Sequence, residues 1–277
     1  MQSILEVGSE QLRYNKEING RENWYMALFH NEELFEKIGA QISDTNEKMK
    51  ELLIRKPFTE DFSRRFCWSS NAIEGNTLSL DETVDFLDYD EVRSGHSYSE
   101  YQDTKALYRA ICTMLLPLER RIIDEKWIQR SNAILMMSEE GYRQKDVYIG
   151  TTLEAVYYPP SYEKVSECMT EFMKYLSVSG KDIVDSLNNI AKNHMDFERI
   201  HPFPDGNGRT GRMILNQQLI NEGLLPIIIE AKGDYRQAFR RYDRNGDISQ
   251  MVHIIAKGEL TSIERVNQLY DRKNNRK

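Results

Sequence analysis

One twelve-residue stretch of this 277-residue chain gathers the side chains that could do chemistry. Residues 201–212 read His-Pro-Phe-Pro-Asp-Gly-Asn-Gly-Arg-Thr-Gly-Arg, so an imidazole, a carboxylate, three glycines and two guanidiniums lie close together. The unperturbed pKa of a histidine lies near working pH, so His201 is expected to act as a base, whereas Arg209 and Arg212 keep their charge and suit phosphate oxygens. The stretch predicts an anion site with a base at its mouth.

Two helices are expected to position this stretch. Apolar residues and histidines recur at spacings of three and four over residues 183–201, as on one buried face of a helix that Pro202 and Pro204 then end. His194 on this face is expected to be a core histidine. A second helix is expected over residues 209–221. The glycine-rich loop would then lie at the N-terminus of the second helix, where free backbone N–H groups and the helix dipole favour a polyphosphate.

Other interpretations fit the motif less well. The glycine spacing of residues 206–211 matches a dinucleotide-binding fingerprint, but that fingerprint needs a preceding strand, and here a helix is expected. A calcium loop starting at Asp205 needs Glu at its twelfth position, where Asn216 stands. The same test excludes a loop starting at Asp243, because its twelfth residue is Ile254. A plain glycine-rich turn does not account for a His, an Asp and two Arg at fixed offsets.

Residues 201–212 resemble the signature of the Fic family, His-Pro-Phe-x-Asp/Glu-Gly-Asn-Gly-Arg-x-x-Arg, at every fixed position. The resemblance extends from about residue 60 to residue 260. It implies a mostly helical domain that transfers AMP from ATP to a hydroxyl of a protein, a reaction called AMPylation or adenylylation. ATP is then a co-substrate, and Mg²⁺ is the expected metal ion.

The resemblance and the chemistry of the motif together assign roles in phosphate binding. The phosphates of ATP are expected over Gly206, Asn207 and Gly208, at the helix N-terminus. Arg212 would hold the γ-phosphate, and Arg209 would support the loop or the β-phosphate.

The chemical step is assigned to His201 and Asp205. His201 would take the proton from a Ser, Thr or Tyr hydroxyl of the target protein, and attack at the α-phosphorus would release pyrophosphate. Asp205 would hold Mg²⁺, because a carboxylate suits a hard cation that bridges phosphate oxygens. By similarity to Fic proteins, the adenine side of the pocket is expected after the motif, with Tyr235 and Asn245 as candidates.

A second resemblance lies upstream, where Ser70-x-x-x-Glu74-Gly75 is similar to the inhibitory motif Ser/Thr-x-x-x-Glu-Gly/Asn of Fic proteins that inhibit themselves. On a helix expected near residues 60–75, Ser70 and Glu74 share a face. A lone carboxylate at a helix end is ordinarily solvated. Here we expect Glu74 to pair with Arg212, which would occupy the γ-phosphate ligand and repel the triphosphate. ATP could still bind, with its α-phosphate turned away from in-line attack.

The region over residues 142–160 is rich in β-branched and aromatic residues and is expected to form a short hairpin. In Fic proteins the corresponding segment is the flap, which aligns the target peptide by strand addition. A purely structural hairpin is the alternative interpretation. The candidate docking residues are Val147, Ile149, Gly150, Thr151 and Thr152.

The whole sequence predicts an all-α fold, namely a Fic-type helical domain with a short β-hairpin flap and an N-terminal helical lobe. An N-terminal helical extension is expected over residues 1–57, with Pro57 closing its helix. The Fic domain is expected over residues 58–270, followed by a solvated tail over residues 271–277. The extension could equally be an oligomer contact.

Bulk composition argues against several classes of protein. The net charge of -7 and the pI near 5.4 disfavour a general nucleic-acid binder. No apolar run approaches the length of a membrane span, and the N-terminus lacks a signal pattern. Cys67, Cys112 and Cys168 are odd in number and share no metal-ligand spacing, which favours a reducing, cytoplasmic location.

Two further functions stay open beside AMP transfer. The protein could move another phosphate-containing group or remove AMP, with Glu74 positioning a water molecule, or it could be a non-catalytic ATP-binding module held closed by Glu74. The sequence also leaves open the target protein, modification of the protein by itself, and assembly into a homodimer.

Overall fold

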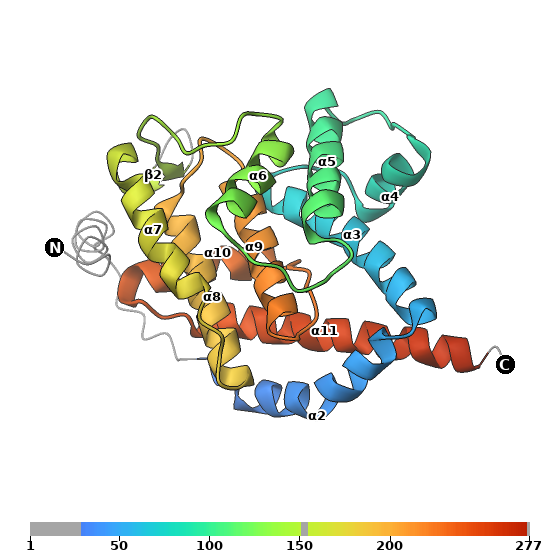
Figure 1. The fold of residues 1–277 in the computed structure, drawn as a ribbon. Helices are drawn as coiled ribbons and strands as arrows, with labels where there is room; N and C mark the ends of the chain where they lie inside the picture. Colours follow the sequence, from blue (N-terminus) through green and yellow to red (C-terminus); the bar gives the residue numbers. More distant parts are fainter. Residues whose placement is uncertain (1–28, 151–154, 276–277) are drawn as a thin grey trace.

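The computed structural model describes residues 29–150 and 155–275. Over these residues the chain forms helices joined by loops, with one small β-hairpin, so the expected all-α class is confirmed (Figure 1). The helices are α2 (Glu32–Met49), α3 (Leu52–Glu74), α4 (Leu80–Tyr89), α5 (Tyr98–Ala110), α6 (Glu125–Met136), α7 (Val165–Leu176), α8 (Ile183–Ile200), α9 (Asn207–Asn221), α10 (Lys232–Asn245) and α11 (Ser249–Asn274). The strands are β1 (Ile149–Gly150) and β2 (Ala155–Tyr157), and single turns of π-helix (Ile111–Leu115) and 3-10 helix (Tyr162–Lys164) follow α5 and precede α7.

Polar caps explain where several helices begin. The hydroxyls of Ser79 and Ser97 each accept a hydrogen bond from the backbone N–H three residues on, and a glutamate at that position bonds back to the cap. These two capping boxes satisfy otherwise unpaired donors at the starts of α4 and α5. The carboxylates of Asp124 and Asp182 each accept a hydrogen bond from the backbone N–H three residues on, and so cap α6 and α8.

Helices α8 and α9 lie side by side in the middle of the molecule, and α11 runs below them (Figure 1). One hydrophobic cluster lies between this pair and helices α2, α3, α10 and α11, and a second lies between the pair and helices α3, α5, α6 and α7. Because α9 is enclosed by both clusters, its polar side chains are buried with it, including Arg209 and Arg212. The fold thus places two guanidiniums inside the protein.

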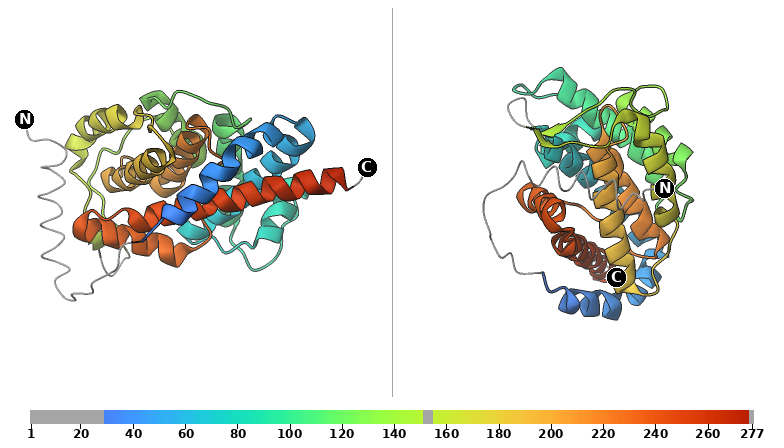
Figure 2. Two further views of the ribbon diagram at one scale, coloured as in Figure 1. Left: turned by 90° about the horizontal axis from the view of Figure 1, so that it is seen from below. Right: turned by 90° about the vertical axis from the view of Figure 1, so that its left-hand side faces the viewer.

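The N-terminal helix is part of the main core, and the expected helix end at Pro57 is wrong. The break between α2 and α3 lies at residues 50–51, and α3 continues through Pro57. Pro57 is exposed near the start of α3, where water can reach the carbonyl that loses its backbone partner. Helix α2 crosses α11 on the underside of the molecule (Figure 2) and contributes the fully buried Ile38 to the first cluster.

The C-terminal helix also extends further than the sequence suggested. A solvated tail was expected over residues 271–277, but α11 continues to Asn274. Lys273 near its end forms an ion pair with Glu51 and lies 5.5 Å from the ring centroid of Tyr270. These contacts fasten the last turn of α11 to the start of α3 and favour continued helix.

The hairpin forms within the predicted region. Strands β1 and β2 pair antiparallel, with Ile149 opposite Tyr157. The predicted docking residues Thr151 and Thr152 lie outside the described residues. Tyr157 is buried, so the hairpin packs on the helical body, as a two-stranded unit must do to be stable.

Two observations bear on the class of protein. Across the two described ranges, no helix combines the length and the apolar content that crossing a bilayer requires. All three cysteines are free thiols, with Cys67 and Cys168 buried and Cys112 exposed.

A buried carboxyl holds the extended segment of residues 224–229 against α11. Glu259 is fully buried, and its Oε1 accepts a hydrogen bond of 2.8 Å from the backbone N–H of Leu225. Its Oε2 has no hydrogen-bond partner among the described residues. Burial therefore raises the pKa of Glu259 to about 8.

We expect Glu259→Gln to remove a fall in stability between about pH 4.5 and pH 8. The native carboxyl binds its proton more tightly than the unfolded one, so its contribution is fully present below about pH 4.5 and is lost as pH rises to about 8. The free energy of unfolding should fall with a slope of at most about 1.4 kcal/mol per pH unit in that window. Denaturant unfolding from pH 5 to 9 should give a flatter profile for Glu259→Gln.

The exposed Glu264 on the same helix supplies the control. Glu264→Gln should leave the wild-type profile in place. Equal profiles for wild type and Glu259→Gln would show that the buried carboxyl is not protonated.

Candidate functional site

The loop between α8 and α9 is shaped by backbone that turns left-handed at both ends. His201 caps α8 with φ 50° and ψ 59°, and Gly206 precedes α9 with φ 76°. Between them, the Asn207 amide bonds the backbone N–H and the carbonyl of Phe203, both at 2.9 Å. Phe203 is fully buried, so this pair of bonds ties the loop to the core. The side chain of Asn207 is therefore used to hold the loop in shape. The backbone N–H of Asn207 is not part of these bonds and lies at the start of α9.

The first turn of α9 keeps backbone N–H groups that no side chain binds. The N-cap residue Gly206 has no side chain to cap the helix, and its own N–H donates to Asp205 Oδ1. Among the described residues, no side chain accepts a hydrogen bond from the N–H groups of residues 207–209, and the dipole of this buried helix adds positive potential. These are the features of a helix N-terminus that binds phosphate.

His201 is held as a neutral imidazole with one nitrogen available. Burial lowers its pKa to about 4. Its Nδ1 lies 3.2 Å from the backbone carbonyl of Glu198, which can accept a hydrogen bond but cannot donate one. Nδ1 therefore carries the proton, and Nε2 has the free lone pair of a base.

Arg143 supports His201 from the base of the hairpin, and the sequence reasoning missed it. Its side chain is almost completely buried, and Nε donates a 2.9 Å hydrogen bond to the carbonyl of His201. The same guanidinium donates to the carbonyls of Pro160 and Lys145, and the backbone N–H of Arg143 donates to Pro202. A single arginine in a loop carries no spacing signal that could have revealed this role.

Arg212 lies inside the protein and is bonded by residues of the predicted inhibitory helix. Its Nε donates to Ser70 Oγ, and Nη2 donates to the Ser70 carbonyl, both at 2.8 Å. Nη2 also lies 2.6 Å from Glu74 Oε1. Burial opposes the charge of Glu74, but Arg212 outweighs it and holds the pKa of that carboxyl below its usual value. The structure thus brings together the three residues that the sequence linked.

Two glycines of α9 make room for two carboxyl groups. A side chain at Gly208 would collide with Glu74 Oε1, and a Cβ at Gly211 would lie 2.5 Å from Glu198 Oε1. Glycine at both positions lets an acid from α3 and an acid from α8 approach the start of α9. Glu74 consequently occupies space next to the backbone over which phosphate was predicted.

Arg209 is held by different partners from those of Arg212. Its Nη1 lies 3.0 Å from Asp103 Oδ1 and 3.4 Å from Asn71 Oδ1. These contacts join the first turn of α9 to helices α3 and α5. The geometry therefore favours the predicted role of supporting the loop over contact with the β-phosphate.

The two candidates for the adenine side lie in different surroundings. Tyr235 is buried, and its hydroxyl lies 2.7 Å from His194 Nε2 and 3.4 Å from Arg212 Nη1. Burial lowers the pKa of His194 to about 3, so it is a neutral core histidine as expected. Asn245 lies at the exposed end of α10, where its side chain accepts a hydrogen bond from the backbone N–H of Asp247.

Asp205 presents an exposed carboxylate beside the N-terminus of α9. Its Oδ1 accepts a 2.5 Å hydrogen bond from the N–H of Gly206, and its carbonyl accepts one from Asn132. Within the described ranges no three His, Cys, Asp or Glu residues gather as metal ligands. One carboxylate fits Mg²⁺, which commonly takes its other ligands from phosphate oxygens and water.

The hairpin is fastened to α8 two residues before His201. Arg199 lies 4.5 Å from the ring centroid of Tyr157 in β2 and 4.6 Å from that of Phe239 in α10. It also bonds both carboxylate oxygens of Asp243 at 2.6 Å. Strand β2 is therefore tied to the helix that presents the base.

The predicted docking residues that the structure describes differ in exposure. Val147 and Ile149 are half-buried, whereas Gly150 is exposed at the end of β1. Backbone at that end of the hairpin is accessible to another strand, as strand addition requires. Their role in docking stays a prediction.

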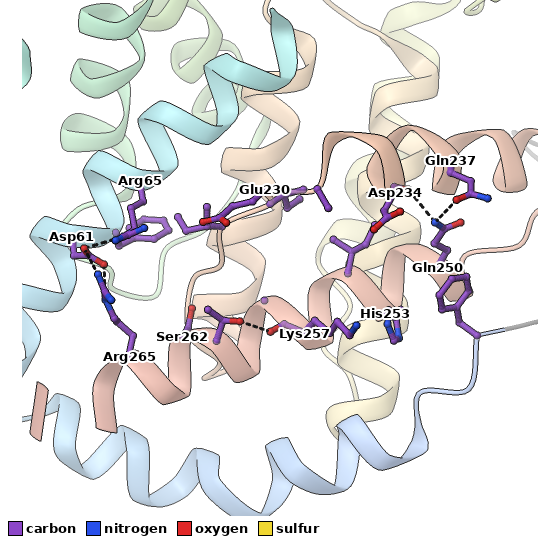
Figure 3. A pocket seen from close by; sticks show the side chains of 18 of the residues that line it. Asp61, Arg65, Glu230, Asp234, Gln237, Gln250, His253, Lys257, Ser262 and Arg265 are labelled. Atoms are coloured by element: carbon purple, nitrogen blue, oxygen red, sulfur yellow. Dashed lines mark hydrogen bonds and ion pairs between the residues drawn. The ribbon is translucent and has the colours of Figure 1, made fainter. Parts of the chain in front are cut away.

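A cavity of about 490 Å³ lies away from residues 201–212, between α3, α10, α11 and the chain before α10 (Figure 3). At one end Asp61 is held between Arg65 and Arg265. At the other end Gln250 bonds Gln237 and the carbonyl of Asp234. None of residues 201–212 lines this cavity, so it is separate from the motif.

Sequence comparison with known proteins finds similarity over the region that contains the loop between α8 and α9. Residues 122–219 match the model of the Fic/DOC family. The protein adenylyltransferase fic-1 of Caenorhabditis elegans is 29% identical over 210 residues, covering 72% of this chain and 40% of that protein. The protein adenylyltransferase Fic of Nematostella vectensis is 29% identical over 200 residues, covering 69% of this chain and 45% of that protein. The chain thus spans less than half the length of these curated relatives.

Solved structures show the same fold. The structure of Fic-1 from C. elegans has a TM-score of 0.72 at 22% identity and covers 88% of this chain and 73% of that chain. A Fic domain containing signaling protein from Bacteroides thetaiotaomicron has a TM-score of 0.68 at 20% identity, with coverage of 82% and 97%. At these identities the likeness establishes the fold.

We expect Arg143→Lys to destabilise the protein and loosen His201. Lysine cannot reproduce the fork that bonds three carbonyls, and each buried acceptor left unpaired costs about 1–3 kcal/mol. Denaturant unfolding should show a loss of at least about 2 kcal/mol. The exposed Arg130 on α6 gives a matched control, and Arg130→Lys should change little. Equal stability of the two variants would contradict a supporting role for Arg143.

Proposed function

We propose that this chain is a protein adenylyltransferase that Glu74 holds inactive, and the match of residues 122–219 to the Fic/DOC family model supports this proposal. It transfers AMP from ATP to a Ser, Thr or Tyr hydroxyl of a target protein. The observation that carries the proposal is the buried Arg212 at the start of α9, paired with Glu74 at 2.6 Å. A guanidinium in this place is a ligand for an anion, and a carboxylate now occupies it.

The triphosphate lies over the N-terminus of α9. The backbone N–H groups of Asn207 and Gly208 face its oxygens, Gly206 leads the backbone into the helix, and Gly208 allows close approach. Arg212 binds the γ-phosphate, because an arginine fork suits phosphate as well as carboxylate. Tyr235 lies against Arg212 and marks the nucleotide side of the pocket.

His201 is the general base of the transfer. Its Nε2 accepts the proton of the attacking hydroxyl, whose oxygen forms a bond to the α-phosphorus. The bond between that phosphorus and the oxygen bridging to the β-phosphate breaks, and pyrophosphate leaves. Because burial lowers the pKa of His201 to about 4, the imidazole is neutral at neutral pH and its Nε2 lone pair is unprotonated.

Asp205 is the residue that would hold Mg²⁺. Its carboxylate is exposed at the loop and lies beside the phosphate-binding helix start. A bound Mg²⁺ would neutralise charge on the phosphate oxygens. Asn132 fixes the backbone of Asp205 through a 2.9 Å hydrogen bond to its carbonyl.

Glu74 inhibits by occupying Arg212 and the space over Gly208. Its carboxylate oxygen lies where the γ-phosphate has to bind, and its negative charge repels the triphosphate. Ser70 contributes by bonding Arg212 through its hydroxyl and its carbonyl, which orients the guanidinium toward Glu74. ATP that binds in this state lacks the γ-phosphate contact that would align its α-phosphate.

We expect Glu74→Gly to raise transfer activity by at least about tenfold, because a charge-assisted hydrogen bond contributes roughly 1.5–3 kcal/mol. Incubation with ATP labelled at the α-phosphate should label protein, whereas ATP labelled at the γ-phosphate should not. Glu74→Gln, which keeps the shape and loses the charge, should give an intermediate rate. Glu91→Gly in an exposed loop is the control and should match wild type.

Other label patterns would point to other functions. ATP binding without transfer of either label would support a non-catalytic module. Transfer of the γ-label would indicate movement of a different group, and loss of AMP from a modified protein would indicate the reverse activity. A Glu74→Gly variant no more active than wild type would contradict inhibition by Glu74.

We expect His201→Ala in the Glu74→Gly background to lower transfer by about 100- to 10,000-fold, the usual contribution of a general base. ATP affinity measured by calorimetry should stay within a few-fold, because the imidazole contacts the hydroxyl and not the phosphates. A transfer rate equal to that of the parent variant would remove His201 from the mechanism.

A further inference from the structure

A buried carboxyl lies near Arg212, in the cluster of charged side chains that we call the Arg212 centre (Arg212, Glu74 and Glu198), and has no part in the mechanism so far. Glu198 is on α8, one turn before His201, and is 7% exposed. Its Oε1 has no hydrogen-bond partner among the described residues. The same oxygen lies 2.5 Å from where a Cβ at Gly211 would stand, directly before Arg212 in α9. A buried, unpaired carboxyl at this place needs an explanation.

The charged and titratable groups around Glu198 come from four helices. The charges of Arg212 on α9 and Glu74 on α3 act on Glu198, and Glu198 acts in turn on Tyr235 of α10. On α8 itself, Arg199 is a further cation that acts on Glu198, and the neutral imidazoles of His194 and His201 lie one turn to either side. Of the two carboxyl groups, Glu74 forms the ion pair with Arg212, and Glu198 acts on the guanidinium at longer range.

We propose that Glu198 is a proton-carrying second carboxyl of the Arg212 centre, neutral while an anion occupies the guanidinium and ionised while the guanidinium is free. It positions Arg212 by supplying a counter-charge in the interval between the departure of Glu74 and the arrival of phosphate. This inference rests on the proposed function, because the arriving anion is the terminal phosphate of ATP.

The electrostatics of the closed state support this role. Burial raises the pKa of Glu198 to about 7, Arg212 opposes the rise, and the charge of Glu74 adds to it. Removal of Glu74 leaves Arg212 unopposed, so the pKa of Glu198 falls and the carboxyl loses its proton to solvent. Arrival of the γ-phosphate restores a negative charge, and Glu198 takes a proton back from solvent.

This exchange predicts a sign for the pH dependence of ATP binding. The nucleotide-bound form holds one proton more than the open, empty form between the two pKa values of Glu198. Affinity for ATP therefore weakens as pH rises through that window, by at most about tenfold per pH unit for one proton. A carboxyl that is neutral in every state gives no such dependence.

Calorimetry on the Glu74→Gly variant tests the proposal, with a non-reactive α,β-methylene analogue of ATP as the probe. Titrations at pH 7.5 in two buffers of different ionisation enthalpy measure the protons taken up on binding. The same titrations on Glu74→Gly/Glu198→Gln remove the contribution of Glu198 and leave that of the nucleotide itself. We expect a higher proton uptake in the single variant, and tighter binding in the double variant at pH 8.5.

The results separate failure of this inference from failure of the proposed function. Equal proton uptake in the two variants would overturn the role of Glu198. A Glu74→Gly variant that binds no nucleotide would overturn the proposed function instead. Infrared difference spectroscopy of Glu74→Gly reads the carboxyl without a second substitution. Nucleotide binding should create a band of a protonated carboxyl, and its absence would contradict the proposal even if Glu198→Gln fails to fold.

Discussion

A guanidinium shielded from water must be surrounded by acceptors, and the site is built around this requirement of Arg212. The side chain is 1% exposed, and its partners are the hydroxyl and carbonyl of Ser70, the carboxylate of Glu74 and the hydroxyl of Tyr235. These acceptors belong to helices α3 and α10, which lie far apart in the sequence. One buried charge therefore holds three helices together and leaves a strong anion ligand at the start of α9.

The close packing of α9 explains how so much charge fits in one place. Gly208 and Gly211 have no side chains, and the carboxyl groups of Glu74 from α3 and Glu198 from α8 fill the space where side chains would otherwise lie. Arg209 has a different set of partners, with Asp103 of α5 as its ion-pair partner. The two arginines of the motif thus join α9 to different neighbours, since Arg209 contacts α3 and α5 and Arg212 contacts α3 and α10.

The sequence predicted the parts of the site that depend on local residue order. The helix end at His201, the glycine-rich start of α9 and the hairpin are each determined by residues next to one another in the chain. The pairing of Glu74 with Arg212 spans 138 residues and was found through a resemblance in two separate motifs.

Contacts set by packing were not predictable in this way. Arg143 and Glu198 acquire their surroundings when α8 and the hairpin meet, and no spacing in the sequence signals either contact. The expected helix end at Pro57 failed for a related reason. Local propensity disfavours proline inside a helix, but the apolar face of α3 is buried on both sides of Pro57 and keeps the helix continuous.

The continuity of α3 determines how Glu74 can leave Arg212. Its first half contributes Ile54 and Phe58 to the core, so the helix as a whole is a fixed part of the fold. Glu74 is its last residue, is followed by the left-handed Gly75, and keeps 43% of its side chain exposed. Separation of Glu74 from Arg212 therefore needs only a rotation of the Glu74 side chain at the end of α3, and the rest of the helix can stay folded. The pair between Glu74 and Arg212 can therefore break while the core contacts of α3 stay intact.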